Sequence, residues 1–127
     1  MLRIECLTID AADPAALSGF WSRLLGWPVS SDDEGEYWIS PADDQPPNAA
    51  VGLLFLPSTD QRTGKNRLHL DLRPDDQDAA VQVALELGAR RIDIGQTGEE
   101  TWVVLADPEG NEFCILRTLP REPASPA

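Results

Sequence analysis

One unit of sequence occurs twice in this 127-residue chain, and the repeat constrains the fold more than any other feature. Each copy has an alternating apolar segment, an aspartate that can cap a helix, an amphipathic helical pattern and a Leu-Gly stop. The two capping aspartates, Asp13 and Asp76, lie 63 positions apart, and the stops are Leu25-Gly26 and Leu87-Gly88. A duplicated supersecondary unit predicts two packed copies with a ligand site between them.

The first copy reads as βαβββ. Alternation over 2–10 predicts a strand, in which Leu7 and Ile9 face one side. Asp13 precedes Pro14, which suits the first position of a helix, and the apolar spacing predicts a helix over about 14–25 that Gly26 ends. The short strands expected after it are 27–31, 36–40 and 51–56.

The second copy repeats this order. We expect a strand over 67–73 and a helix over about 76–87, with Ala80, Val83, Ala84 and Leu87 on its apolar stripe. Gly88 ends this helix. The strands expected after it are 91–94, 101–106 and 111–116, with a tight turn at Asp107-Pro108-Glu109-Gly110 between the last two.

Length and composition predict one domain over 1–118, with modules at about 1–60 and 64–118 and a flexible tail at 119–127. The net charge of −12 disfavours nucleic acid and anionic membranes as partners. Without a signal-peptide core or a long apolar run, a cytoplasmic location is expected. Both cysteines, Cys6 and Cys114, lie in predicted strands and are expected to be reduced.

Strand alternation predicts which side chains face a shared cleft. If Leu68, Leu70 and Leu72 pack under the second helix, the residues between them point the other way. The same reasoning applies to the first strand of the first copy and to the last strand of the second, whose Phe113 and Ile115 face the helix. The predicted cleft lining is Cys6, Thr8, Asp10, His69, Asp71, Glu112 and Cys114.

Four motifs in order resemble the glyoxalase-like branch of the vicinal oxygen chelate superfamily, which includes glyoxalase I, extradiol dioxygenases and the bleomycin and fosfomycin resistance proteins. The resemblance covers about residues 2–117. The motifs are Asp13-Pro14, Phe20-Trp21-Ser22-Arg23-Leu24-Leu25-Gly26-Trp27, Lys65-Asn66-Arg67-Leu68-His69-Leu70-Asp71-Leu72 and Asp107-Pro108-Glu109-Gly110-Asn111-Glu112-Phe113-Cys114. The resemblance implies an α+β fold of two tandem βαβββ modules, a curved mixed sheet around a central cleft, and a homodimer.

The resemblance also implies where a divalent metal would be held. The family's four ligand positions fall on Cys6, His69, Cys114 and a residue within 53–56, which reads Leu-Leu-Phe-Leu. Glyoxalase or dioxygenase chemistry requires a cage of oxygen and nitrogen ligands, and only His69 matches the usual set. We therefore predict no metal cofactor, with a zinc site of Cys6, His69 and Cys114 as the open alternative.

Several side chains have both a functional and a structural interpretation. His69 and Glu112 are the candidate acid and base, and each is also interpretable as a hydrogen-bonded structural group. Aromatic side chains could stack on a ligand or simply pack the sheet. Arg67 could bind an anionic group or lie in solvent. The candidate ligand-binding residues are Cys6, Thr8, Asp10, Trp38, Phe55, Arg67, Asp71, Trp102 and Cys114.

The sequence therefore predicts a protein that binds a small organic molecule between its modules. Whether it also transforms that molecule, as a lyase or an oxidoreductase with a site around His69, is left open. The alternative without catalysis is a sequestering protein similar to the bleomycin resistance proteins, and the acidic charge favours a basic ligand for it.

Overall fold

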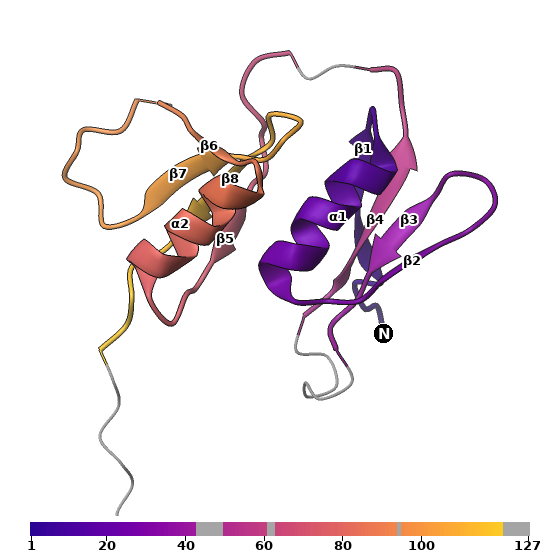
Figure 1. The fold of residues 1–127 in the computed structure, drawn as a ribbon, viewed down its shortest axis with the longest axis horizontal. Helices are drawn as coiled ribbons and strands as arrows, with labels where there is room; N and C mark the ends of the chain where they lie inside the picture. Colours follow the sequence, from indigo (N-terminus) through magenta and orange to yellow (C-terminus); the bar gives the residue numbers. More distant parts are fainter. Residues whose placement is uncertain (43–49, 61–62, 94, 121–127) are drawn as a thin grey trace, which may run out of the picture.

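Two βαβββ modules make up the fold in the computed structural model, which describes residues 1–42, 50–60, 63–93 and 95–120. In Figure 1 the helix of each module lies across its own sheet. The first module contains β1 (Cys6–Ala11), α1 (Pro14–Leu25), β2 (Val29–Ser31), β3 (Tyr37–Ile39) and β4 (Gly52–Pro57). The second contains β5 (Leu70–Leu72), α2 (Gln77–Leu87), β6 (Arg90–Arg91), β7 (Val103–Ala106) and β8 (Glu112–Ile115).

Both sheets have the same topology. Their strand orders are β1-β4-β3-β2 and β5-β8-β7-β6. The first and last strands of each module pair in parallel, and the other pairs are antiparallel. The predicted α+β fold class and its repeat are thus confirmed. In each sheet the first strand of the module lies at an edge, so β1 and β5 each have one edge that no strand of its own sheet covers.

The helices begin and end at the predicted signals. Asp13 and Asp76 each accept a hydrogen bond from the backbone N–H three residues later, at 3.1 Å in both cases. Such a cap satisfies a donor that the first helical turn leaves free. Gly26 and Gly88 follow the last turns with φ of 73° and 117°, a backbone region that suits glycine.

An aromatic cluster joins the two modules. Phe20 and Trp21 of α1 pack edge to face at 5.3 Å between ring centroids, and Trp21 lies 4.9 Å from Phe113 of β8. All three rings are buried. Edge-to-face pairs add about 0.5–1.5 kcal/mol beyond the area that they bury. The modules therefore share one core, which holds the two sheets in a defined relation.

Three predictions about strands and faces need correction. The first strand begins at Cys6 rather than residue 2, because its partner β4 begins at Gly52, which pairs with Cys6. The strand predicted over 67–73 is only Leu70–Leu72, so Leu68 is not packed under α2 but is 80% exposed. On α2, Val83 is exposed and Val81 is buried, because the stripe that meets the core is rotated toward Val81 and Ala84.

The strand predicted over 91–94 also needs correction. It is only Arg90–Arg91, and it begins at Arg90 because that residue pairs with Ala106, where its partner β7 ends. The turn at 107–110 forms, with a hydrogen bond from the Gly110 N–H to the Asp107 carbonyl at 2.9 Å. Residues 43–48, which are acidic and Pro-rich in the sequence, and most of the predicted tail at 119–127 lie outside the described residues. Neither α1 nor α2, the helices of the described part, has the length and apolar character needed to span a membrane.

Candidate functional site

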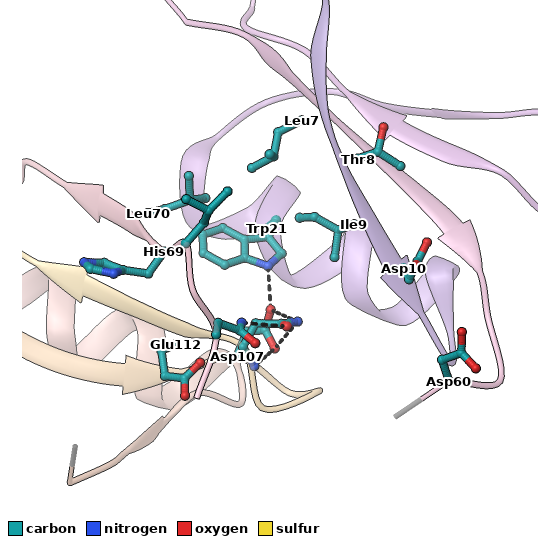
Figure 2. A pocket seen from close by; sticks show the side chains of 13 residues that line it. Leu7, Thr8, Ile9, Asp10, Trp21, Asp60, His69, Leu70, Asp107 and Glu112 are labelled. Atoms are coloured by element: carbon teal, nitrogen blue, oxygen red, sulfur yellow. Dashed lines mark hydrogen bonds between the residues drawn. The ribbon is translucent and has the colours of Figure 1, made fainter. Parts of the chain in front are cut away.

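A pocket of about 600 Å³ lies between the two modules. One wall comes from β1 and α1, and the other from the segment that leads into β5 and from the turn before β8 (Figure 2). The pocket thus takes its lining from β1 and from Leu70 of β5, the first strands of the two modules. Its lining is Leu7, Thr8, Ile9, Asp10, Trp21, Asp60, Asn66, Leu68, His69, Leu70, Asp107, Asn111 and Glu112.

A buried hydrogen bond between the modules forms the floor of the pocket. The Trp21 Nε1–H donates to Asp107 Oδ2 at 3.0 Å, as Figure 2 shows. The other oxygen of Asp107 accepts from the backbone N–H groups of Glu109 and Asn111, and the Asn111 side chain donates as well. A carboxylate that is 1% exposed requires such partners, because burying a charge without them is costly. Asp107 therefore fixes both its own turn and the indole.

The same turn holds the start of α1. The two carboxylate oxygens of Glu109 accept hydrogen bonds from the backbone N–H groups of Ala12 and Asp13, at 2.7 and 3.0 Å. An anion at this position also interacts favourably with the positive end of the helix dipole. Asp107 and Glu109, both in one turn of the second module, thus accept hydrogen bonds from α1 and from the residues just before it.

Four acidic side chains lie in the polar lining of the pocket. Asp10 and Asp60 are exposed and lie at one end in Figure 2, while Glu112 and His69 lie toward the other. Glu112 is only 7% exposed. Neither lysine nor arginine occurs among the lining residues in the described part of the chain. Leu7, Ile9 and Leu70 supply half-buried apolar surface between the two ends.

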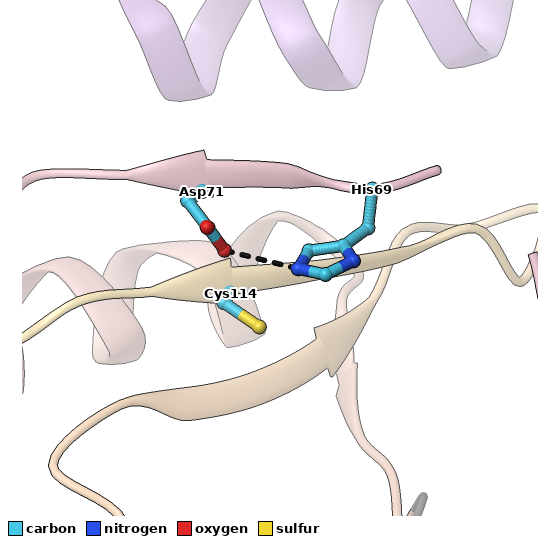
Figure 3. A group of neighbouring side chains, drawn as sticks. All are labelled: His69, Asp71 and Cys114. Carbon is cyan, nitrogen blue, oxygen red and sulfur yellow. Dashed lines mark ion pairs between the residues drawn. The ribbon is translucent and has the colours of Figure 1, made fainter. Parts of the chain in front are cut away.

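A second group of side chains lies on the outer face of the second sheet. His69 Nε2 forms an ion pair with Asp71 Oδ1 at 3.1 Å (Figure 3). Asp71 is directly opposite Cys114 in the register of β5 and β8. Burial raises the pKa of the Cys114 thiol to about 11, with further contributions from the charge of Asp71 and a hydrogen bond to it. At neutral pH the thiol is therefore protonated.

His69, Asp71 and Cys114 have donor atoms within 4.8 Å of one another. A nitrogen, an oxygen and a sulfur donor suit Zn²⁺, which tolerates mixed ligands and leaves a fourth position open in catalytic sites. The residues therefore fit one zinc ion if Cys114 loses its proton. Cys6, expected as the third ligand, is not part of this group; its sulfur lies 3.8 Å from the Thr8 hydroxyl. Both cysteines are free thiols.

The structure divides the predicted site residues among four places. The pocket contains Thr8, Asp10, His69 and Glu112, and His69 also belongs to the group with Asp71 and Cys114. The prediction that Phe55 binds a ligand needs correction. Phe55 is 0% exposed and pairs with Ile9 and Tyr37 in the core, where a ligand does not reach it. The predicted residues that line neither the pocket nor the group are Cys6, Trp38, Arg67 and Trp102.

Sequence reasoning did not predict the hydrogen-bonded residues at the floor of the pocket. The sequence placed Trp21 in a helix, Asp107 in a turn and Asn111 at the start of a strand, yet together they form the floor. One signal was available, because an Asp four positions before an Asn in a Pro-Gly turn is typical of a side chain that bonds its own backbone. Asp60 and Asn66 lie in connections, where periodicity gives no information.

Comparisons with solved structures support the fold. The chain is similar to a glyoxalase/bleomycin resistance protein/dioxygenase family enzyme from Burkholderia phytofirmans, with a TM-score of 0.69 and 20% identity over 91% of this chain and 98% of that one. The antibiotic-binding protein TnmS3 from a Streptomyces species gives 0.59 and 19%, over 92% and 96%. The fosfomycin resistance protein FosX from Mesorhizobium loti gives 0.66 and 11%, over 94% of both chains.

No curated protein matches the chain by sequence. The glyoxalase-like domain family, however, matches residues 6–116, which is most of the chain and contains every described strand and both helices. The duplicated βαβββ topology agrees with this match. The chain therefore belongs to the glyoxalase-like domain family of the vicinal oxygen chelate superfamily.

Proposed function

We propose that this protein binds a small organic molecule in the pocket between its two modules. The observation that carries the proposal is the pocket itself: about 600 Å³, lined from both modules, with apolar walls and a few polar groups. Ligand sites in proteins commonly have this size and composition. The antibiotic-binding protein among the similar structures is consistent with binding as a function of the fold.

Binding of a flat neutral compound tests this proposal. Naphthylmethanol would be titrated into the protein by calorimetry, and we expect saturable binding to one site. Leu70→Trp adds bulk to the pocket wall and should weaken binding at least tenfold, while Leu56→Trp changes a leucine that is equally half-buried in a strand but lies outside the pocket. Circular dichroism would show that both variants fold. Equal affinity in all three proteins would contradict the proposal.

A metal-dependent role around His69 is the second candidate, and the group of His69, Asp71 and Cys114 favours it. In such a protein the zinc ion would polarise an oxygen of the bound molecule, as Lewis acids do. These residues would hold it by their nitrogen, oxygen and sulfur donors. Because Cys114 must release a proton that its surroundings retain, affinity should fall as the pH is lowered.

Zinc binding would be measured by calorimetry on protein without a histidine tag. His69→Ala should abolish stoichiometric binding, and Asp75→Ala, which changes an exposed aspartate outside the group, should not. Retention of zinc by His69→Ala would contradict this second candidate. Acid–base catalysis by His69 and Glu112 stays a prediction.

The homodimer and the cytoplasmic location also stay predictions from the sequence. Exposed Leu2, Ile4 and Leu68 provide apolar surface that a second copy could cover. Light scattering coupled to size-exclusion chromatography would measure the mass in solution.

A further inference from the structure

On the basis of the binding function proposed above, we propose that the ligand is an organic cation with a flat apolar body. Its amine would lie near Asp10 and Asp60, and its apolar body would lie against Leu7, Ile9 and Leu70.

The first step is the charge of the pocket. Four of its lining residues are aspartate or glutamate, and none is lysine or arginine among the residues that the structure describes. The chain as a whole carries −12. Acidic clefts in a protein of the same sign concentrate cations and repel anions. The negative electrostatic potential of this pocket would therefore repel an anionic ligand.

The second step separates carboxylates that already have partners from those that do not. Asp107 accepts its hydrogen bonds from Trp21, Asn111 and its own turn, so it is committed to the fold. Asp10 and Asp60 instead face the pocket from exposed positions, and neither forms an ion pair within the described residues. Among the described residues, these two carboxylates are therefore the ones that a cation could pair with.

The third step is the arrangement along the pocket. Figure 2 shows Asp10 and Asp60 at one end, and Leu7, Ile9 and Leu70 around the indole of Trp21. A ligand that spans the pocket would thus meet charge at one end and apolar surface in the middle. An amine attached to an aromatic or aliphatic ring system has this distribution.

Three probes of matched shape test the charge preference: naphthylmethylamine, naphthylmethanol and naphthoate. At neutral pH they carry a positive charge, no charge and a negative charge. We expect the amine to bind about tenfold more tightly than the alcohol, which corresponds to two weak, partly solvated ion pairs. The carboxylate should bind most weakly. Raising NaCl from about 0.05 M to about 0.5 M should reduce the advantage of the amine, because salt screens exposed charges.

The double variant Asp10→Asn/Asp60→Asn should lose this advantage, so that the amine and the alcohol bind equally. Asp33→Asn/Glu34→Gln is the matched control, because it removes the same charge from an exposed turn outside the pocket and should keep the preference. The alcohol should bind the control variant as it binds the natural protein, and circular dichroism would show that both variants fold.

The outcomes separate the two proposals. If the alcohol binds but the amine has no advantage, or if the advantage survives Asp10→Asn/Asp60→Asn, the cation preference is overturned and the binding function stands. If none of the three probes binds at millimolar concentration, both proposals fail.

Discussion

The last strands of the two modules, β4 and β8, occupy equivalent places in their sheets but differ in how deeply they are buried. Each pairs in parallel with the first strand of its module. Along β4 buried residues alternate with half-buried ones, whereas all four residues of β8 are buried. The first sheet thus has half-buried residues along its last strand, whereas in the second sheet the last strand is buried and the neighbouring Asp71 of β5 is exposed.

This difference determines what side chains at equivalent positions are able to do. Thr8 pairs with Leu54, and the corresponding pair in the second module is Asp71 and Cys114. The second pair contains a thiol whose pKa is raised by burial, next to an exposed aspartate. The second module therefore holds the buried titratable thiol, while the first contributes apolar wall and two exposed aspartates to the pocket.

Removing the hydrogen bond between Trp21 and Asp107, which connects the modules, should have the largest effect on stability. Asp107→Ala leaves the Trp21 indole N–H and the Asn111 amide without their buried acceptor. Leaving buried donors unpaired costs about 1–3 kcal/mol each, so we expect a loss of about 3 kcal/mol in the free energy of unfolding, measured with urea. Asp33→Ala, in an exposed turn, serves as the control. A loss no larger than that of the control would contradict the role of Asp107.

The burial of Cys114 on β8 should protect its thiol from modification. Only the thiolate reacts with iodoacetamide, and Cys114 has a pKa of about 11, so at mildly alkaline pH its modification should be at least about tenfold slower than that of a free thiol. Peptide mass spectrometry would follow the reaction. Asp71→Asn removes the charge that helps to raise the pKa and should speed it up. Modification at the rate of a free cysteine would contradict the burial of β8.

The same group predicts a pH dependence of stability. From about pH 8.5, the ordinary pKa of a cysteine, the unfolded chain releases its thiol proton, while the folded chain keeps it up to about pH 11. Stability that is fully present below this range is therefore lost as the pH rises through it. Cys114→Ala should remove this loss, and urea titrations across the range would measure it.

The helix caps should show how far the modules are alike. Asp13→Ala and Asp76→Ala each remove one hydrogen bond of 3.1 Å at the start of a helix. Each should lower the free energy of unfolding by about 1 kcal/mol. A several-fold difference between the two variants would show that the equivalence of the modules does not extend to their helix starts.

The outer face of β3 and β4 should contribute least to binding. Trp38 is 37% exposed on this face and does not line the pocket. Trp38→Ala should therefore change the affinity for naphthylmethanol by less than twofold in calorimetry. A tenfold loss of affinity would instead indicate that the ligand binds on the outer face of β3 and β4 and not in the pocket.

Much of the fold could be predicted because its signals are local. The caps at Asp13 and Asp76, the glycines at 26 and 88 and the strand periodicity depend on a few neighbouring residues. Strand length depends instead on the partner, so Leu68 was wrongly assigned to a packed strand. Alternation also does not show how deeply a strand is buried, so the difference between the alternating burial of β4 and the complete burial of β8 was not predicted.

The site was less predictable than the fold. Alternation predicted that Thr8, Asp10, His69 and Glu112 share a cleft, and these four line one pocket. Phe55, named because an aromatic ring can stack on a ligand, lies in the core instead. The hydrogen bond between Trp21 and Asp107 joins residues 86 positions apart and depends on how the modules pack. Such a contact has no periodic signal in the sequence.

Amide chemical shifts measured by NMR during titration with naphthylmethylamine would test the central claim most directly. Binding between the modules predicts that the residues at 7–10 and at 66–70 shift together and saturate at the same concentration, because both segments line the pocket. Shifts confined to one module, or centred on Trp38 and Leu54 of the outer face of β3 and β4, would contradict it.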